Sequence, residues 1–560
     1  MRSDFSGSSE GAISAVALAP VPEWFEPRLP EPEECSLAHR LWQLSEASPD
    51  RVFATFDDGQ AWTNAEAWQQ VRDTAGRLKH LGIAPGDRVA VWLPNGASML
   101  RYIFAVSALG AVLVPVNIAL VGSPLAHVLT KSAPRLLIAH AELLDRLAVV
   151  ETSALPDIVT VDGNAVESVA TGAGRVVPET ALTSDTLAKP HLYQPWDLMG
   201  IVFSSGTTGP SKGVQIPHAQ VWSLGRSFYG YTSVDDRMLL VLPLFHIGAL
   251  GALYGAMSTG ASLALTESFR ASTFVDVIRR TGATTVPGLG RTLIETLMRT
   301  PARADDADNP LRVCIVQSGN ALVRAFAQRF GCQVMACYSM TETSCIAISP
   351  LNGVIDGSLG RPRKGIEVRL VDEHDREVPE GSPGEVVVRA SLPWVLNAGY
   401  FRDPEASQSA WRNGWFHTGD VARKDELGNL YFVDRNKDVI RRRSENISSS
   451  ELEAEVRTHI TVADAAAIGV ETAEGEEVLV VVVPSEGQQI NPSELIHYLI
   501  ERLPHYMVPR FLRVVTQLPK TQGTNRVQKA SLRVEGITPD CWDREAVGIK
   551  VKRRTLSTKG

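Results

Sequence analysis

A stretch rich in glycine and hydroxyl side chains has the composition of a phosphate-binding loop. It reads Phe203-Ser-Ser-Gly-Thr-Thr-Gly-Pro-Ser-Lys-Gly213 and continues the apolar residues Ile201 and Val202. Glycine lets the backbone approach an anion closely, hydroxyl groups donate hydrogen bonds, and lysine adds a positive charge. A flexible linker shares this composition, but it has no reason to end a buried strand and to carry a lysine. The loop predicts phosphate ligands at Ser204, Ser205, Gly206, Thr207, Thr208 and Lys212.

The loop differs from the P-loop of common nucleotide triphosphatases. Counting from Gly206, the pattern G-x-x-x-x-G-K-[ST] requires glycine where Ser211 stands and a hydroxyl residue where Gly213 stands. The stretch resembles the S-G-T-T-G-x-P-K-G signature of the adenylate-forming (ANL) superfamily, which includes acyl-CoA ligases, peptide-synthetase adenylation domains and luciferases. Pro210 and Ser211 take the place of x-P in that signature.

Further motifs of the same superfamily follow in the superfamily's order, so that the resemblance covers about Ser36 to Arg533. They are Pro243-Leu-Phe-His-Ile-Gly248, Ser318-Gly-Asn-Ala321, Tyr338-Ser-Met-Thr-Glu-Thr343, Trp415-Phe-His-Thr-Gly-Asp420, Asp434-Arg-Asn-Lys-Asp438, Ser444-Glu-Asn-Ile447 and Leu503-Pro-His-Tyr-Met-Val-Pro509. Motifs in the right order over nearly the whole chain identify it as similar to an acyl-CoA ligase.

The resemblance implies a role for each motif. Tyr338 would stack on adenine and Thr341 would bond phosphate, while Glu342 would hold Mg²⁺, a cation that proteins bind through few carboxylates together with phosphate oxygens. His246 would lie beside the acyl pocket, and Lys437 would be the pivot about which a small C-terminal domain rotates. The other implied nucleotide contacts are Gly319, Asn320, Ala321, Asp420, Phe432 and Arg435, and the face that meets coenzyme A would carry Arg443, Ser444, Glu445 and Asn446.

The superfamily's catalytic lysine is missing from this chain. By the resemblance, ATP and a carboxylic acid first give acyl-AMP, and coenzyme A then displaces AMP. In the first half-reaction a lysine in the pattern P-K-T-x-x-G-K-[IV] bridges the two reacting anions, with Mg²⁺ beside them. Here the stretch reads Leu518-Pro-Lys-Thr-Gln-Gly-Thr-Asn-Arg-Val-Gln-Lys529. Counting forward from Pro519 places Asn525 at the catalytic position, and counting back from Val527 places Arg526 there.

Three interpretations stay open for the missing lysine. Arg526 keeps the charge, although its planar guanidinium is not interchangeable with a compact ammonium. Lys520 or Lys529 could swing in, against the spacing. In the third, adenylation is weak or lost, since removing one preorganised electrostatic contact costs about 10²–10³ in rate. We favour the third: an enzyme strong in thioester formation and poor in adenylation, which takes acyl-AMP from a partner enzyme. The implied cofactors are Mg²⁺, ATP or AMP held as acyl-AMP, and coenzyme A.

We expect the acyl pocket to surround His246. Its other predicted lining residues are Ile247, Gly248, Leu250, Gly288 within Val286 to Leu289, and Gly319. Small residues there would leave volume for a bulky apolar acyl group rather than acetate, although glycine can serve the backbone instead. No aspartate stands at an obvious position to hold an amino group, which argues against an amino-acid substrate.

Helical and strand-like segments alternate from Ser36 onward, which predicts a parallel sheet with helices on both faces. Near Gly357 the pattern changes to short alternating strands. We expect an α/β protein with a large N-terminal AMP-binding domain over 36–435 and a small mobile α+β domain with a basic tail over 436–560. The large domain would contain αβ subdomains at about 36–195 and 196–355 and a small β-barrel at about 356–435. Residues 1–35 are expected to form a disordered leader.

Composition narrows the class of protein. A formal net charge of −8 over 560 residues argues against nucleic-acid binding. No apolar run reaches the roughly 18 residues that span a bilayer. The six cysteines include no CxxC pair, so we expect reduced thiols, no zinc site and a cytoplasmic location.

Four alternatives remain beside the favoured reading. They are a full two-step synthetase that uses Arg526, an adenylation domain that loads a carrier protein, a luciferase-like oxidation, and a degenerate module that binds AMP without turnover. The presence of Glu342, Asp420, Arg435 and Lys437 together argues against the degenerate module.

Overall fold

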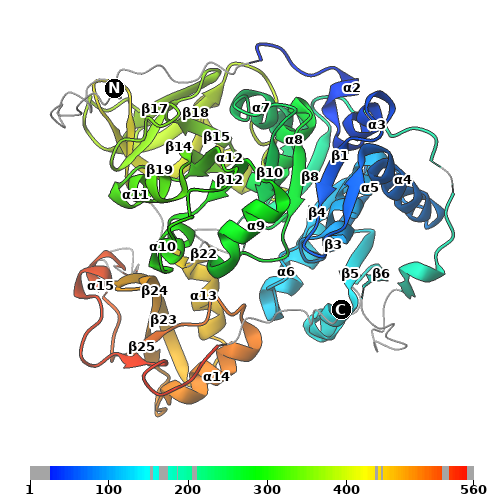
Figure 1. Cartoon of the computed structure of the whole chain (residues 1–560). Coiled ribbons are helices and arrows are strands. Elements are labelled where there is room, and N and C mark those ends of the chain that lie inside the picture. Colours follow the sequence, from blue (N-terminus) through cyan, green and yellow to red (C-terminus); the bar gives the residue numbers. More distant parts are fainter. Residues whose placement is uncertain are drawn as a thin grey trace.

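The computed structural model describes residues 26–151, 155–162, 175–185, 187–204, 211–435, 439–442, 445–519, 527 and 529–551. Two large sheets with covering helices form the N-terminal part, and two small sheets form the C-terminal part (Figure 1). This arrangement confirms the predicted α/β class with a large first domain and a smaller second one.

The first sheet has seven strands in the order β7-β6-β5-β3-β4-β8-β9. All neighbouring strands are parallel except β8 and β9, which form an antiparallel pair. Its strands are β3 (Arg88–Trp92), β4 (Val112–Pro115), β5 (Leu136–His140), β6 (Asp157–Val161), β7 (Val176–Pro178), β8 (Leu198–Ser204) and β9 (Lys212–Pro217). Strands such as β4 and β5 are buried at every residue because helices cover both faces, which explains their unbroken apolar sequence.

The second sheet has thirteen strands in the order β17-β18-β19-β20-β16-β15-β14-β13-β12-β10-β11-β1-β2. Its parallel part comprises β1 (Val52–Thr55), β10 (Arg237–Leu240), β11 (Ser262–Leu265), β12 (Thr285–Leu289), β13 (Val313–Val316) and β14 (Gln333–Met340). Antiparallel strands extend it at both ends: β2 (Ala61–Thr63), β15 (Ser344–Ile348), β16 (Ser358–Pro362), β17 (Ile366–Val371), β18 (Gly384–Ala390), β19 (Phe416–Lys424) and β20 (Leu430–Arg435). The short strands expected after Gly357 are therefore continuous with this sheet through β15 and β16.

The two sheets exchange strands across the expected subdomain boundary at residues 195 and 196. The β1 strand, early in the chain, pairs with β11 of the second sheet, whereas β8 and β9, late in the chain, complete the first sheet. Strand pairing between distant segments leaves no signal in local periodicity, so sequence alone could not place these pairs.

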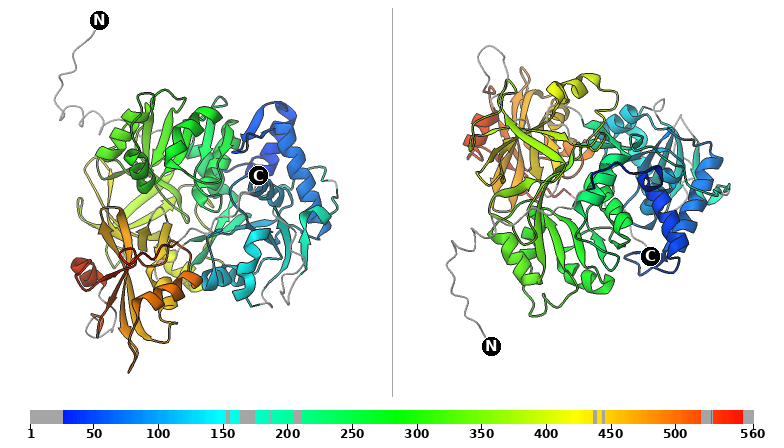
Figure 2. Two further views of the ribbon diagram at one scale, coloured as in Figure 1. Left: turned by 60° about the horizontal axis from the view of Figure 1, so that its bottom comes forward. Right: turned by 90° about the horizontal axis from the view of Figure 1, so that it is seen from above.

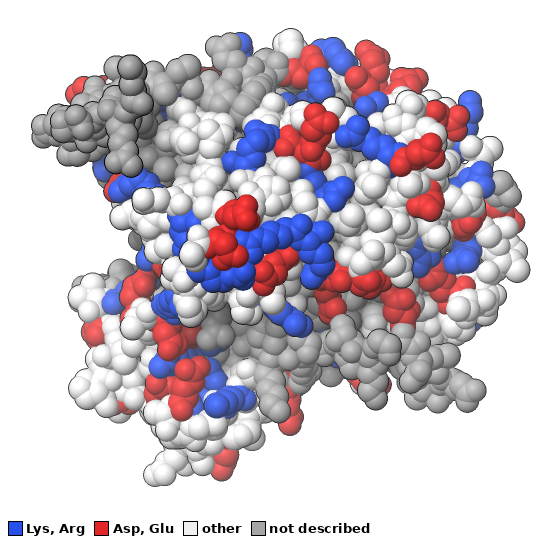
Figure 3. Space-filling view, in the orientation of Figure 1, with Lys and Arg blue, Asp and Glu red and all other residues white. Residues whose placement is uncertain are grey.

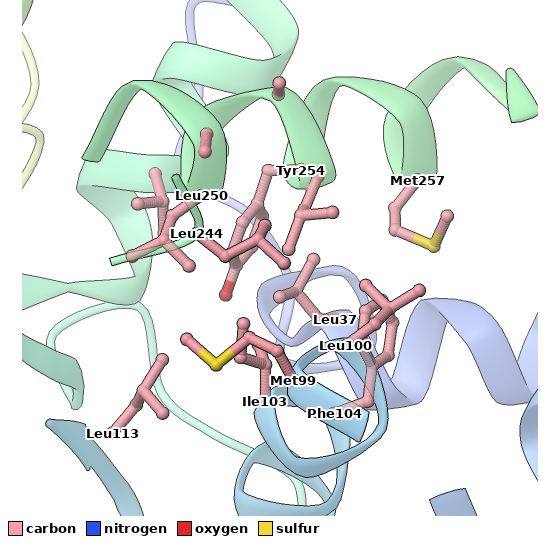
Figure 4. Packing of buried hydrophobic residues seen from close by; sticks show 14 of the residues in the cluster. Leu37, Met99, Leu100, Ile103, Phe104, Leu113, Leu244, Leu250, Tyr254 and Met257 are labelled. Atoms are coloured by element: carbon pink, nitrogen blue, oxygen red, sulfur yellow. The ribbon is translucent and has the colours of Figure 1, made fainter. Parts of the chain in front are cut away.

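Helices pack on both sheets and hold them together. Those of the N-terminal part are α2 (Pro32–Cys35), α3 (Leu37–Ala47), α4 (Asn64–His80), α5 (Ala97–Ala108), α6 (Gly122–Ser132), α7 (His218–Phe228), α8 (Ile247–Thr259), α9 (Phe274–Thr281), α10 (Arg291–Arg299), α11 (Ala321–Phe330) and α12 (Pro404–Ala410). The largest core cluster lies where α3, α5 and α8 meet; Figure 4 shows Leu100, Phe104, Leu250 and Tyr254 packed there.

Glycines let α8 lie unusually close to α7. A Cβ on Gly251 would overlap the side chain of Leu224, and a Cβ on Gly255 would lie 2.7 Å from the ring of Tyr229. On α7, a Cβ on Gly225 would lie 2.8 Å from the backbone of Tyr254. Gly251 and Gly255, which follow His246 on α8, therefore serve the packing of α8 on α7, as does Gly225 on α7.

The C-terminal part carries two small sheets. The first is the hairpin of β21 (Val439–Arg442) and β22 (Glu445–Ser448), and the second has the order β23-β24-β25-β26. Its elements are β23 (Val462–Thr472), β24 (Gly475–Pro484), β25 (Phe511–Val514), β26 (Trp542–Asp543), α13 (Ser449–Val456), α14 (Pro492–Arg502) and α15 (Lys529–Glu535). Figures 1 and 2 show this unit, orange to red, against one edge of the N-terminal part.

The expected leader is shorter than predicted. Glu31 caps the short helix α2, Arg28 donates a 2.9 Å hydrogen bond to Glu34, and Cys35 is fully buried. The prediction of a disordered segment up to residue 35 is therefore wrong for residues 28–35, because a capping box and an ion pair order a Pro/Glu-rich segment.

The surface and the helices show two further features. Acidic and basic side chains lie next to one another over much of the described face in Figure 3. Among the described helices, none combines the length and the apolar character needed to cross a membrane.

Candidate active site

The predicted site residues gather where several strands of both sheets end. Ser204 closes β8, His246 lies a short turn after β10, Gly319 follows β13, and Thr341 follows β14. In open α/β sheets such edges bind ligands, because loops from neighbouring parallel strands converge there.

Glu342 lies at the centre of this cluster and is 7% exposed. Its carboxylate accepts hydrogen bonds from Ser204 Oγ at 3.3 Å and from the hydroxyl of Tyr400 at 3.1 Å. Its backbone carbonyl accepts from the backbone amide and the side-chain amide of Asn397, at 2.9 and 3.0 Å. These bonds fix the backbone at Glu342, and its carboxylate faces Ser204 at the start of the predicted phosphate loop.

Tyr400 was not predicted from the sequence. Burial, followed by the adjacent Glu342 carboxylate, raises the pKa of its hydroxyl, so the group stays protonated and donates to Glu342. Lys212 Nζ lies 4.7 Å from the centroid of the same ring. Tyr400 therefore connects the loop lysine with Glu342, and no motif around it in the sequence gives a signal for this role.

The donor set at Glu342 suits Mg²⁺ bound mainly through phosphate. The described residues contain no cluster of three or more His, Cys, Asp or Glu side chains that could hold a metal by themselves. A single buried carboxylate beside a hydroxyl-rich loop fits a cation that takes its other ligands from water and substrate.

Tyr338 and Asp420 meet across the strands of the second sheet. The Tyr338 hydroxyl, on β14, donates a 2.7 Å hydrogen bond to Asp420 Oδ2, on β19. Asp420 is 1% exposed and pairs in register with Arg435 of β20. The predicted adenine and ribose residues thus lie together, although they are separated by about eighty positions in the chain.

His246 borders a cavity between the two parts of the chain. The ring is partly buried, and desolvation lowers its pKa to about 4, so the imidazole is neutral at neutral pH. The cavity, of about 150 Å³, is lined on one side by Ser204, His246 and Thr341 and on the other by residues of the C-terminal part: Glu445, Glu451, Tyr506 and Met507. Burial and the neighbouring Glu455 raise the pKa of Glu451 to about 7.

A second cavity, of about 610 Å³, adjoins the first. The two cavities share Asn117, Phe245, His246, Glu445 and Tyr506. The larger cavity is also lined by four basic side chains, Arg442, His505, Arg544 and Lys550, and by the glutamates Glu267, Glu445 and Glu545. The basic side chains among these lining residues could contact the phosphates of a ligand bound between the two parts of the chain.

The predicted acyl-pocket residues have different surroundings. Gly248 and Gly288 both face the side chain of Leu242. A Cβ on Gly248 would lie 3.2 Å from Leu242 Cδ1, and a Cβ on Gly288 would lie 2.7 Å from the same atom. Ile247 and Leu250 are buried in the largest core cluster. A Cβ on Gly319 would lie 2.4 Å from the backbone carbonyl oxygen of Ile355, too close for a real contact. Glycine at this position therefore lets the two backbone segments pack together.

The remaining predicted residues have structural partners or lie outside the description. Asn320 caps α11, since Oδ1 accepts from the Val323 amide at 2.8 Å, and Ala321 is the first residue of that helix. The Phe432 ring lies under the Arg441 guanidinium at 5.3 Å. Asn446 is described only as part of β22. Those outside the described residues are Ser205, Gly206, Thr207, Thr208, Lys437, Arg443, Ser444 and Arg526.

Lys529 is one of the two lysines considered as a substitute for the catalytic lysine that the sequence predicts to be missing. Its Nζ donates to Ser449 Oγ at 2.8 Å and forms an ion pair with Glu453 at 2.5 Å, both on α13 of the same small domain. In this orientation Lys529 therefore stabilises the packing of α15 on α13.

Residues 41–401 match the family described as AMP-binding enzyme, and residues 451–524 match the AMP-binding enzyme C-terminal domain. The crotonobetaine/carnitine–CoA ligase of Salmonella paratyphi B is 30% identical over 477 residues, 82% of this chain and 91% of the ligase.

Among solved structures, the chain resembles a double mutant of o-succinylbenzoate CoA synthetase from Bacillus subtilis bound to a product analogue, OSB-NCoA. The TM-score is 0.77 at 25% identity, over 90% of this chain and 99% of that one. The same synthetase with its acyl-adenylate intermediate, OSB-AMP, gives a TM-score of 0.62 at 25% identity, over 88% and 97% of the two chains.

Proposed function

This chain belongs to the AMP-binding enzyme family and is an acid–thiol ligase of the acyl-CoA synthetase class, and from that premise we propose that it joins an acyl-AMP to coenzyme A much better than it makes acyl-AMP from ATP. The observation that carries the proposal is the channel between the two domains. It is formed by the two adjoining cavities, which reach from Ser204 and Thr341 past His246 to a stretch lined by Arg442, His505, Arg544 and Lys550 as well as glutamates.

The orientation of the small domain supports thioester formation. Glu445 and Tyr506 of that domain line both cavities next to His246. The chain also resembles the synthetase with the CoA product analogue more than the same synthetase with acyl-adenylate, at TM-scores of 0.77 and 0.62. Both observations fit a domain placed for the second half-reaction.

The chemistry of that step requires little from acid–base groups. The CoA sulfur forms a bond to the acyl carbonyl carbon and its thiol proton passes to solvent. The bond from that carbon to the phosphate oxygen breaks, so that AMP leaves with the electron pair. Neutral His246 borders the place where the two substrates would meet and adds no charge there. Tyr338, Asp420 and the loop after Ser204 would hold the nucleotide in place, which lowers the entropic cost of the reaction.

Weak adenylation follows from the residues in the small domain. Asn525 or Arg526 stands where the family has its lysine, and Lys529 is held by Ser449 and Glu453. When bound at Glu342, Mg²⁺ would neutralise phosphate charge in that first half-reaction. The substrate pair is thus acyl-AMP and CoA, with acyl-AMP supplied by a partner adenylating enzyme. All six cysteines are unpaired, which favours the cytoplasm as the location.

The test compares the two half-reactions in one preparation. One arm supplies carboxylic acid, ATP, Mg²⁺ and CoA, and the other supplies synthetic acetyl-, hexanoyl-, benzoyl- or naphthoyl-AMP with CoA. We expect rapid thioester formation only in the second arm, with a bulky apolar acyl group favoured. Equally fast turnover in both arms would refute weak adenylation and favour a two-step synthetase that uses Arg526.

Two variants and one acceptor sharpen the test. Arg526→Lys should raise the rate of the first arm if Arg526 occupies the position of the family's lysine. Asn525→Lys should raise that rate if Asn525 occupies the position instead. A phosphopantetheinyl carrier protein in place of CoA distinguishes a carrier-loading adenylation domain, and the basic side chains Arg442, Arg544 and Lys550 in the larger cavity favour free CoA with its phosphates.

A further inference from the structure

One contact between the two domains involves none of the predicted nucleotide residues. Helix α6 of the large domain begins at Gly122, and its first turn faces α13 and α14 of the small domain. Ser123 Oγ donates a hydrogen bond to a carboxylate oxygen of Glu455, and Arg502 forms an ion pair with the other oxygen of the same carboxylate. Glu455 is 4% exposed, so this carboxylate is desolvated and held by a partner on each side of the domain boundary.

The backbone at this contact fits only because Gly122 has no side chain. Gly122 has φ +60°, and a Cβ there would overlap the carbonyl oxygen of Arg502, at the end of α14. The N-terminus of α6 has no side-chain cap and no acidic residue of its own in its first turn. The buried Glu455 carboxylate therefore supplies the negative charge that the N-terminus of a helix favours.

The contact is mechanically connected to the cavity beside His246. Glu455 lies four residues after Glu451 on α13, so the two carboxylates lie on the same face of that helix. Glu451 lines the cavity with His246, while Glu455 touches α6. The position of α13 against α6 therefore sets how the small-domain side of the cavity faces His246.

We propose that Gly122, Ser123, Glu455 and Arg502 form a docking contact that positions the small domain for thioester formation, an inference that rests on the proposed function. Rotation of the small domain to another orientation has to separate Glu455 from Ser123. Breaking or blocking the contact then slows the CoA step and leaves nucleotide binding by the large domain unchanged. Glu455 and Gly122 act as positioning residues, since neither lines the cavity.

Gly122→Ala tests the proposal sterically. Gly86→Ala is its matched control, because Gly86 has φ +84° with nothing within 4 Å of its missing Cβ, so both variants carry the backbone strain but only one meets the small domain. We expect Gly122→Ala to lower the rate of thioester formation from the best acyl-AMP of the panel by about tenfold or more, as domain closure limits turnover. Its AMP affinity, measured by calorimetry, should match that of Gly86→Ala. Ser123→Ala and Glu455→Gln should lower the rate less, in the same direction.

A distance measurement keeps the test independent of turnover. Spin labels at Thr130 on α6 and His497 on α14, both exposed, report the distance between the domains. We expect one short distance in the parent chain, which Gly122→Ala converts into a longer or broader distribution while Gly86→Ala does not. An unchanged distribution in Gly122→Ala, or a loss of AMP affinity that parallels the loss of rate, would overturn the docking contact. An altered distribution in a chain that makes no thioester from any acyl-AMP would instead refute the proposed function alone.

Discussion

The hydroxyl of Tyr338 donates a 2.7 Å hydrogen bond to the buried carboxylate of Asp420. This bond joins two motifs that are far apart in the sequence, and it holds the predicted ribose ligand before any nucleotide arrives. Preorganisation of this kind lowers the cost of ordering a side chain on binding.

Tyr338→Phe removes the donor and leaves a buried carboxylate without this partner. Loss of a hydrogen bond to a charged group typically costs about 1.5–3 kcal/mol, so we expect AMP affinity to fall by about tenfold or more and thermal stability to decrease. Calorimetric titration with AMP measures the affinity. Tyr431→Phe is the control, since that hydroxyl bonds Asp425 outside the predicted site. Equal loss of AMP affinity in both variants would contradict the preorganisation of Asp420.

Glu342→Gln should separate the two half-reactions. The variant keeps a side chain of similar shape beside Ser204 and Tyr400 but loses the charge that would hold Mg²⁺. We expect Mg²⁺-dependent release of pyrophosphate from ATP and acid, however slow in the parent chain, to fall by about 10²–10³. Thioester formation from preformed acyl-AMP should change much less, because no pyrophosphate leaves in that step. A parallel loss of both activities would show that Glu342 has only a structural role.

Leu242→Ala should widen the range of acyl groups. The Leu242 side chain lies against both Gly248 and Gly288 and also lines the larger cavity, so its removal opens space beside His246. We expect the ratio of kcat/KM for naphthoyl-AMP to that for acetyl-AMP to rise by about tenfold, in the range that a few methylene groups produce in an apolar pocket. Leu242→Met, which conserves volume, is the control. An unchanged ratio would show that the acyl group lies elsewhere.

Acidification should destabilise the chain through His218. Burial lowers the pKa of this histidine from 6.5 to about 3, and its ring bonds the Cys35 carbonyl and the Tyr254 hydroxyl. The unfolded chain therefore binds the proton more readily, so the free energy of unfolding falls as pH drops below 6.5 and keeps falling toward pH 3. His218→Asn should unfold at a lower temperature than the parent chain at pH 7. Its unfolding temperature should fall less than that of the parent chain between pH 7 and pH 5. His497→Asn, which replaces an exposed histidine on α14, is the control and should show the same change of unfolding temperature with pH as the parent chain. The same change in His218→Asn would contradict the role of His218 in the acid sensitivity.

The positions of most elements near the site could be predicted from local sequence. The apolar segments Arg88 to Leu93 and Ser262 to Leu265 coincide with β3 and β11 within one residue, and the amphipathic segment Ala65 to Leu81 coincides with α4 to the same precision. Periodicity and chain length carry this information because each element is stabilised by its own apolar face.

Residues that act through contacts between distant segments could not be predicted. Tyr400 reaches Glu342 from a loop without any motif, and Leu242 faces two glycines whose own role was assigned to pocket volume. The leader prediction failed for the same reason, since the burial of Cys35 depends on helices that come later in the chain.

By itself the sequence determined the order of the motifs and the family to which they belong, and it predicted the phosphate loop and the missing adenylation lysine, because these are properties of residue type and spacing. Only the tertiary structure decided which strands share a sheet, which glycines serve packing, and how the small domain docks on α6. Those features depend on the shape and charge of surfaces that come together after folding, and the contact of Gly122 with Arg502 exists in no local pattern.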